Sequence, residues 1–289
     1  MSPPPLLRRH GWRAMLALFA AVLALAGCAT LDEKQREWIF QPSSRAWWGG
    51  LAAAEGMQDV WIDFRSARSG ESVRLHGLWV EHPRPDAPVL LYLHGARWDV
   101  RGSAHRMRRL HELGFSVLGV DYRGFGQSSK VLPSEDFAYE DARAAWDWLA
   151  GQHPQRARYV FGHSLGGAIA VQLASEVNDA RGLIVEGSFT SIPDVFSSFK
   201  WGWLPVGPLI TQRFDAAERI GRLRVPVLVV HGSRDTLIRP ELGRQLFDRA
   251  PEPKRFVLVE GGTHHNTNAI GQAQYRSALA ELFGLSRAE

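Results

Sequence analysis

The strongest constraint on this chain is a turn around Ser164, where two glycines flank one serine at fixed spacing. A short apolar run, residues 159–161, leads into Gly162-His163-Ser164-Leu165-Gly166, and small, helix-tolerant residues follow. This order is typical of a strand, a sharp turn and a helix. The positions two before and two after the apex of such a turn must lack side chains, which glycine satisfies. The pattern therefore predicts a serine held above a sheet, facing the free amides at the start of a helix.

The first 27 residues have the pattern of an export signal. Arg8, Arg9 and Arg13 precede an apolar run at residues 14–26, and this stretch holds no acidic residue. A basic start followed by a short apolar run is typical of a signal peptide. The run is shorter than the ~20 apolar residues that a membrane-spanning helix needs. We therefore expect residues 1–27 to be removed from the mature protein.

The apolar run ends Leu25-Ala26-Gly27-Cys28, which resembles the lipobox of bacterial lipoproteins. This resemblance implies cleavage before Cys28, lipidation of its sulfur and a membrane anchor in the bacterial cell envelope. Cys28 is the only cysteine, so it cannot form an internal disulfide. The residue after Cys28 is Ala29 and not an aspartate. This favours an anchor in the outer membrane, on its periplasmic face. The alternative is a free, buried cysteine behind a plain signal peptide.

The charge of the chain gives no argument for nucleic-acid binding. The net charge of +4 comes largely from the signal, whose three arginines leave 31 basic residues against 30 acidic ones once removed. A nearly neutral mature chain lacks the basic surface that phosphate backbones attract. We expect no nucleic-acid partner, and the sequence does not define an oligomeric state.

The remaining chain divides into an N-terminal extension and one large domain. Residues 28–59 are weakly patterned and interrupted by Pro42-Ser43-Ser44 and Gly49-Gly50, so we expect a tether. Residues 60–289 are long enough to bury a single core. Within this domain, we expect residues 188–222 to form a short, lid-like insert.

Strand and helix patterns alternate along this domain. Residues 60–65 and 73–80 alternate apolar and polar positions and predict an antiparallel hairpin. Continuous apolar runs then predict strands buried on both faces, at residues 88–93, 115–122, 158–161, 182–185, 226–230 and 255–259. Helical stretches lie between them, at residues 104–113, 135–152, 165–177, 241–250 and 273–283. The alternation predicts an α/β fold with a mostly parallel, doubly wound sheet, an antiparallel N-terminal hairpin and helices on both faces.

Polar motifs follow the predicted strands, at the sheet edge where function collects in such folds. They are His94-Gly95-Ala96-Arg97, the segment 121–128, the turn at Ser164, His231-Gly232-Ser233-Arg234-Asp235 and the segment 260–266. A serine, an acid and a histidine thus occur in the order Ser164, Asp235, His264. This is the order of catalytic residues in α/β-hydrolases.

These motifs (LHGA, DYRGFGQS, GHSLGG, HGSRD and GGTHHN) make residues 60–283 similar to the α/β-hydrolase superfamily. Within it, the chain resembles the compact, lid-poor esterases and depalmitoylase-like thioesterases. The resemblance implies acyl transfer, with Ser164 as nucleophile, His264 as base and Asp235 as the acid that orients it.

The same resemblance implies an oxyanion hole made by the backbone amides of Ala96 and Leu165. Two alternatives stay open. His265 adjoins His264 and could serve as the base, and Glu186 follows another strand and could serve as the acid.

The insert carries the aromatic residues Phe199, Trp201 and Trp203, which we expect to bind an acyl chain, because ligand pockets are mainly apolar. The alternative is that this segment only packs on the core. Arg97 departs from the small or amide residue usual in its loop and could favour an anionic group on the substrate. The chain has no convincing metal-ligand spacing and no dinucleotide fingerprint, so we expect neither a metal nor a cofactor.

Three functions fit the sequence. The first is a lipid-anchored serine hydrolase of carboxylic esters or thioesters. The second is a serine peptidase or aminopeptidase of the same fold, although nothing in the insert clearly supplies an acidic or otherwise specific pocket to hold an amine. The third is a non-catalytic envelope protein that keeps the fold for binding.

Overall fold

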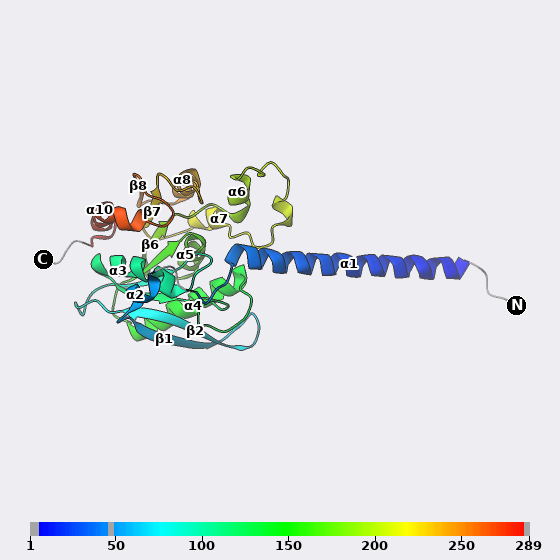
Figure 1. Ribbon diagram of the computed structural model, residues 1–289, viewed down its shortest axis with the longest axis horizontal. Helices are drawn as coiled ribbons and strands as arrows, with labels where there is room; N and C mark the ends of the chain where they lie inside the picture. The colour runs from blue at the N-terminus through cyan, green and yellow to red at the C-terminus, as the bar shows by residue number, and fades with distance from the viewer. Residues whose placement is uncertain (1–5, 46–48, 286–289) are drawn as a thin grey trace.

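A computed structural model describes residues 6–45 and 49–285 (Figure 1). One eight-stranded sheet forms the centre of the domain, in the order β1-β2-β4-β3-β5-β6-β7-β8. The strands are β1 (Gln58–Arg65), β2 (Ser72–Val80), β3 (Val89–Leu93), β4 (Ser116–Val120), β5 (Arg158–His163), β6 (Ala180–Glu186), β7 (Val227–Gly232) and β8 (Lys254–Val259).

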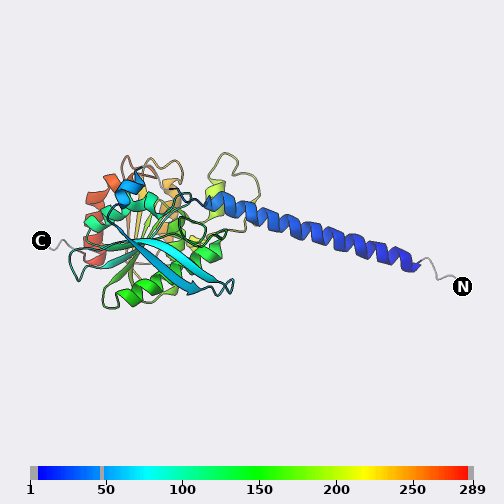
Figure 2. The same cartoon turned by 60° about the horizontal axis from the view of Figure 1, so that its bottom comes forward.

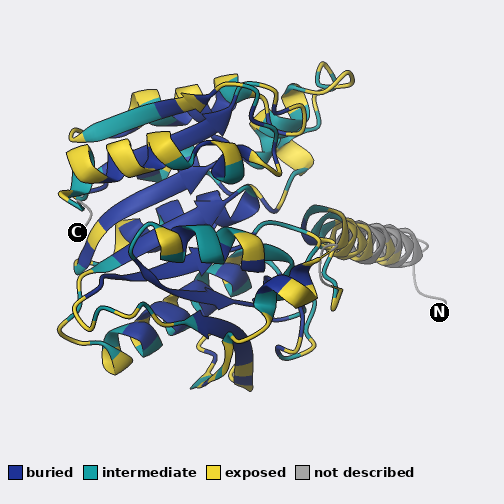
Figure 3. Cartoon of the chain, turned by 60° about the vertical axis from the view of Figure 1, so that its left-hand side comes forward, coloured by how far each residue is buried: buried dark blue, intermediate teal, exposed yellow. Residues whose placement is uncertain are grey.

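The sheet confirms the predicted fold class. β1 pairs antiparallel with β2, with Val60 opposite Gly77, and β2 pairs antiparallel with β4. All other pairs are parallel. Every residue of β3, β4 and β7 is buried, as their continuous apolar sequences require. Figure 3 shows this buried sheet between helices whose outer faces are exposed.

Helices cover both faces of the sheet (Figure 2). On one face, α4 (Glu135–Gln152), α5 (Leu165–Glu176), α7 (Ala216–Ile220) and α8 (Pro240–Arg249) bury apolar residues in the larger core. On the other face, η1 (Val100–Ser103), α3 (Ala104–Glu112) and α10 (Gln272–Phe283) form the second core. The remaining elements are α1 (Leu6–Phe40), α2 (Gly50–Ala54), α6 (Ile192–Ser197), η2 (Gly207–Leu209) and α9 (Thr267–Ile270). The five helices predicted from the sequence are all present, within one residue at each end.

The N-terminal segment forms one long helix, α1, which projects away from the domain (Figure 1). Cys28 lies within α1 and is exposed. Among the described residues, no helix combines the length and the apolar character that crossing a membrane requires.

The structure differs from the simple tether that we expected over residues 28–59, because the end of α1 packs into the domain. Phe40 is fully buried in the larger core. Its ring contacts Phe214 edge-on, with centroids 5.7 Å apart, and also lies near Phe125. Earlier in α1, the Gln35 side chain donates to the Leu209 carbonyl at 2.7 Å. The sequence pattern did not indicate this packing because a single buried aromatic in a polar stretch produces no periodic signal.

Phe40→Ala tests whether this segment is part of the fold. Removing a fully buried phenylalanine leaves a cavity and costs about 3–5 kcal/mol. We expect a loss of that size in the free energy of unfolding, measured by urea denaturation. The matched control is Trp38→Ala, because Trp38 is 63% exposed and exposed positions change stability by only about 0.5 kcal/mol. Equal stability of the two variants would show that residues 28–45 are a tether after all.

Candidate active site

The turn between β5 and α5 holds Ser164 in a strained conformation. Its φ of 56° and ψ of −123° lie in a region that residues with side chains rarely adopt. The flanking glycines allow the turn, since a Cβ on Gly162 would lie 2.2 Å from the Gly166 carbonyl oxygen. A Cβ on Gly166 would lie 2.1 Å from the carbonyl oxygen of Leu93, at the end of β3. The turn therefore places Ser164 above the centre of the sheet, as predicted.

The structure brings Asp235 and His264 together from the loops after β7 and β8. Both are buried, and His264 Nδ1 lies 2.8 Å from Asp235 Oδ2. The other oxygen of Asp235 accepts the backbone amides of Leu237 and Ile238 at 3.0 and 2.9 Å. Burial works to raise the pKa of Asp235, but the hydrogen bonds from His231, His264 and Ile238 outweigh it and lower the pKa below its ordinary value. Asp235 is therefore an anion that fixes His264 with Nε2 free to face the cavity.

The geometry favours His264 over His265, and Asp235 over Glu186. His265 is exposed, whereas His264 has the bond to the carboxylate. Glu186 is buried and accepts from Arg106 Nε at 2.8 Å and from the Tyr275 hydroxyl. Both oxygens of Glu186 are thus engaged away from His264.

His163, directly before Ser164, lies beside the site and contacts His264. Burial, followed by the charge of Arg106, holds the pKa of His163 well below its ordinary value. The ring is therefore neutral, and its Nε2 lies 3.0 Å from the His264 carbonyl oxygen. Since a carbonyl only accepts, His163 donates this bond and restrains the backbone of His264. No sequence pattern distinguishes such a residue from an ordinary core histidine.

Ala96 and Leu165 line the same cavity as Ser164. Leu165 is the first residue of α5, and Ala96 lies in the loop after β3. Within the described residues, neither amide N–H donates a hydrogen bond to another backbone group. The two amides are available to an anion beside Ser164, as an oxyanion hole requires.

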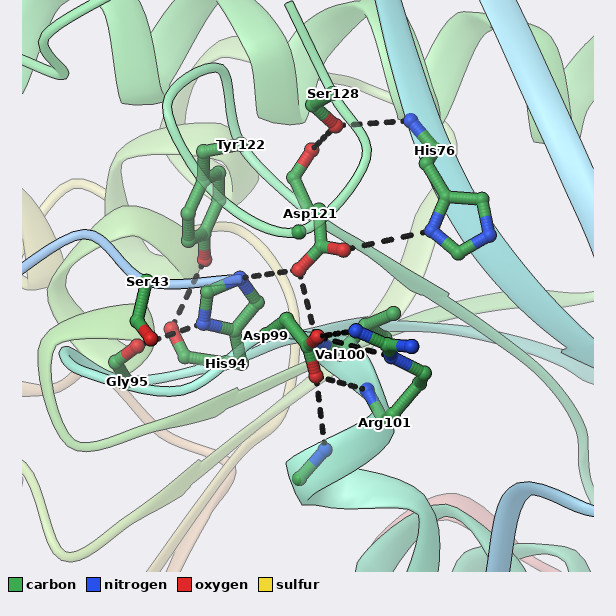
Figure 4. Close-up of polar contacts among 12 residues, drawn as sticks. Ser43, His76, His94, Gly95, Asp99, Val100, Arg101, Asp121, Tyr122 and Ser128 are labelled. Atoms are coloured by element: carbon green, nitrogen blue, oxygen red, sulfur yellow. Dashed lines mark hydrogen bonds and ion pairs between the residues drawn. The ribbon is translucent and has the colours of Figure 1, made fainter. Parts of the chain in front are cut away.

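A buried polar network supports the loop that carries Ala96. Figure 4 shows the Asp121 carboxylate between the rings of His76 and His94. Asp121 also accepts the Val100 amide at 2.7 Å, and His94 Nδ1 donates to the Gly95 carbonyl at 2.6 Å. Burial holds the pKa of His94 below its ordinary value, so the ring is neutral. The loop after β3 is thus held in place by side chains of β2 and of the segment after β4.

The end of α1 supports the same loop from outside. Arg97, directly after Ala96, has a left-handed φ of 84° and donates its backbone amide to the Phe40 carbonyl at 2.9 Å. Its Nε donates to Gln41 Oε1, also at 2.9 Å. A left-handed residue with a side chain costs on the order of 1–3 kcal/mol, which surrounding contacts must offset. The N-terminal segment therefore helps to hold the candidate oxyanion loop in place.

Ser164 and His264 open on a cavity of about 560 Å³, within the range of small-molecule sites. Its apolar side comes mainly from the segment after β6 and includes Phe189, Ile192, Val195, Phe196, Phe199 and Leu237. Phe199 thus lies where we predicted a substrate-binding residue.

Trp201 and Trp203 do not line this cavity in the described structure. They are 60% and 73% exposed, beyond the end of α6. The difference arises because the chain turns away after Phe199, which aromatic content alone does not indicate.

Metal ligation finds no support in the described part of the chain, where no group of three or more His, Cys, Asp or Glu side chains is placed to hold an ion. The chemistry available at the site is that of a serine, a histidine–carboxylate pair and backbone amides.

The sheet order and the turn at Ser164 define the class: the chain has the α/β-hydrolase fold. The family described as "Serine aminopeptidase, S33" matches residues 84–214 and 209–268, and the chain belongs to this family. It is also 35% identical to the "Uncharacterized protein Rv2307c" of Mycobacterium tuberculosis, over 86% of this chain and 88% of that protein. These matches identify the chain as a serine hydrolase of α/β fold.

Two further similarities are more limited. One covers only part of the related protein, and the other is a similarity of fold alone. The chain is 32% identical to the "Lysophosphatidylserine lipase ABHD12" of Danio rerio, over 62% of this chain and 54% of that protein. It thus spans about half of that relative. The esterase Pf2001 of Pyrococcus furiosus has a TM-score of 0.65, with 20% identity, over 84% of this chain and 99% of that structure.

Gln41→Ala tests the support that α1 gives to the candidate oxyanion loop. Loss of the bond to Arg97 frees the residue next to Ala96, and small displacements at a reacting centre reduce turnover by up to about 100-fold. We expect kcat for a soluble ester to fall about 10-fold, with KM and the melting temperature nearly unchanged. Gln41→Glu keeps an acceptor for Arg97 and should retain activity.

The matched control for this test is Gln172→Ala, because the Gln172 side chain donates to Glu176 of the same helix, α5, away from the site. If Gln41→Ala and Gln172→Ala have the same kcat, the bond to Arg97 does not position the loop.

Proposed function

We propose that this chain cleaves carboxylic esters or thioesters through an acyl-enzyme, with Ser164, His264 and Asp235 as the catalytic triad. The observation that carries the proposal is the convergence on one cavity of a strained serine, a histidine bonded to a buried carboxylate, and two available amides. These groups come from the loops after β3, β5, β7 and β8, at the carboxyl ends of the strands. A non-catalytic binding protein would have no need to hold Ser164 in a strained turn.

In the first half of the reaction, His264 Nε2 takes the proton of Ser164 as its Oγ attacks the acyl carbon. The amides of Ala96 and Leu165 donate to the oxyanion that forms, and such donors contribute on the order of 3 kcal/mol each. The tetrahedral intermediate then collapses, and His264 protonates the departing alcohol or thiol. Asp235 stabilises the imidazolium without accepting its proton.

In the second half, water takes the place of the leaving group. His264 removes a proton from the water as its oxygen attacks the acyl carbon of the acyl-enzyme. Collapse of the second intermediate breaks the bond to Ser164 and returns the proton to it. The products are a carboxylic acid and the free enzyme, with no other reactant needed.

The lining of the cavity supports an acyl chain as substrate over a peptide. The wall formed by residues 189–199 is apolar and aromatic, and the described lining contains no carboxylate that could hold a free amino group. The Danio rerio relative is described as a lysophosphatidylserine lipase, which also acts on an acyl lipid. The family description names aminopeptidases, so a peptidase is the second candidate.

A fluorophosphonate probe tests the proposed nucleophile. We expect one adduct on the folded protein by intact mass and none on Ser164→Ala, together with a fall in ester turnover of about 10⁴-fold or more. The matched control is Ser175→Ala, because Ser175 lies on the outer surface of α5 and bonds to the Gln172 carbonyl.

Absence of an adduct on the wild-type protein would contradict the triad. Turnover of aminoacyl amides alone, in a panel of acyl esters, thioesters and amides, would favour the peptidase instead.

We also propose that Cys28 is the lipidated first residue of the mature protein, which would place the enzyme at the bacterial cell envelope. The support is the lipobox-like run before Cys28 and its exposed position in α1.

The substitution Cys28→Ser removes the acceptor sulfur, and we expect the full chain to leave the membrane pellet after expression in bacteria. Ala29→Ser is the matched control and should stay in the pellet. Equal fractionation of both variants would contradict lipidation, and the mass of the wild-type protein would show whether a diacylglyceryl group is present.

A further inference from the structure

One side of the catalytic cavity is positively charged and has no acidic counterpart. Its described lining includes Arg97, Arg106 and Arg109 but no aspartate or glutamate. Arg106 is neutralised behind the wall by Glu186, 2.8 Å from its Nε. Arg97 is held by the neutral side chain of Gln41. Arg109 has no hydrogen-bond or ion-pair acceptor for its side chain among the described residues.

Arg109 is placed on this wall by the face that α3 presents. Met107 and Leu110 are buried in the second core, which fixes the rotation of the helix. His105 and Arg109, four residues apart, therefore share another face, and both line the cavity. Arg109 is half-buried, and the buried side of α3 does not contain it.

The order of the strands separates this wall from the apolar one. β5, which ends directly before Ser164, lies between β3 and β6 in the sheet. The segment after β3 leads to Arg97 and α3, whereas the segment after β6 leads to the apolar residues 189–199. Ser164 therefore lies between a cationic side and an apolar side of one cavity.

We infer that the α3 side of this cavity, with Arg109 as its main contact, binds the phosphate of a phosphate-bearing acyl ester. This inference rests on the proposed esterase function and assigns the two halves of the substrate. The acyl chain lies along residues 189–199, the scissile carbonyl lies at Ser164, and the phosphate lies at Arg109. A guanidinium matches phosphate oxygens with two parallel N–H bonds and stays charged at any physiological pH. Arg97 adds a second positive charge to the lining of the cavity.

Two substrates that differ only in the phosphate test the assignment. The pair is 1-octanoylglycerol and 1-octanoylglycerol 3-phosphate, both used below their micelle concentrations. For Arg109→Ala, we expect KM for the phosphate ester to rise about 10-fold, while the kinetic constants for the neutral ester change less than twofold. Arg109→Glu should raise that KM further. Arg244→Ala, on the outer surface of α8 where Arg244 pairs with Asp248, is the matched control.

Binding without turnover provides a second measurement. Glycerol 3-phosphate should inhibit hydrolysis of the neutral ester competitively in the wild type and in Arg244→Ala, but about 10-fold more weakly in Arg109→Ala. The proposal is overturned if Arg109→Ala affects both esters equally, or if glycerol 3-phosphate inhibits all variants alike. Those results would leave the esterase function intact. Failure of the wild type to cleave either ester, or any other ester of the panel, would instead count against the proposed function.

Discussion

The site depends on one close approach, where the turn at Ser164 presses against the end of β3. The Cβ that Gly166 lacks would lie 2.1 Å from the Leu93 carbonyl oxygen, so no larger residue fits there. This contact brings the start of α5 next to the loop that follows β3. The amides of Leu165 and Ala96, which belong to elements about 70 residues apart, consequently face one cavity. The strain at Ser164 is the cost of this contact, and the packing of the fully buried Ala168 and Ile169 in the larger core offsets it.

The parallel sheet distributes the chemistry among separate loops. The serine follows β5, the carboxylate follows β7 and the histidine follows β8. The loops also support one another, since His163, directly before Ser164, holds the carbonyl of His264, while two backbone amides fix Asp235. The cavity walls come from α3 and the segment after β6, outside these supports.

The central part of the fold could be predicted because its signals are local. A buried parallel strand such as β3 needs a continuous apolar run, and the turn at Ser164 needs its two glycines. The sequence also indicated which of these loops carry polar groups, and the structure brings Ser164, Asp235 and His264 to the same end of the sheet. Two strands are longer than their apolar runs: β5 ends at His163 and β7 at Gly232. Loops enclose these last residues, so a polar residue or a glycine is buried there.

Features that depend on distant contacts could not be predicted. Trp201 and Trp203 look like pocket residues by composition, but they lie beyond the turn after Phe199 and are largely exposed. Phe40 sits in a stretch that resembles a linker, and only the gap between Phe125 and Phe214 explains its burial. Arg109 is one of several basic residues in α3, and the sequence does not indicate which of them line the cavity. In each case the feature depends on a residue more than 70 positions away in the sequence, or on the position of the cavity.

The packing of α1 has a consequence for the orientation of the site. Trp38 and Ile39 line the cavity, and Phe40 and Gln41 hold the loop next to Ala96. Cys28 lies ten residues before Trp38 in the same helix, a rise of ~15 Å. A flexible tether would let the domain turn freely on a lipid anchor, whereas this helix is joined rigidly to the cavity wall. With the anchor that we propose at Cys28, the cavity would open at a fixed and short distance from the membrane. An enzyme held in this way could take an amphipathic ester from the lipid surface without first releasing it into water.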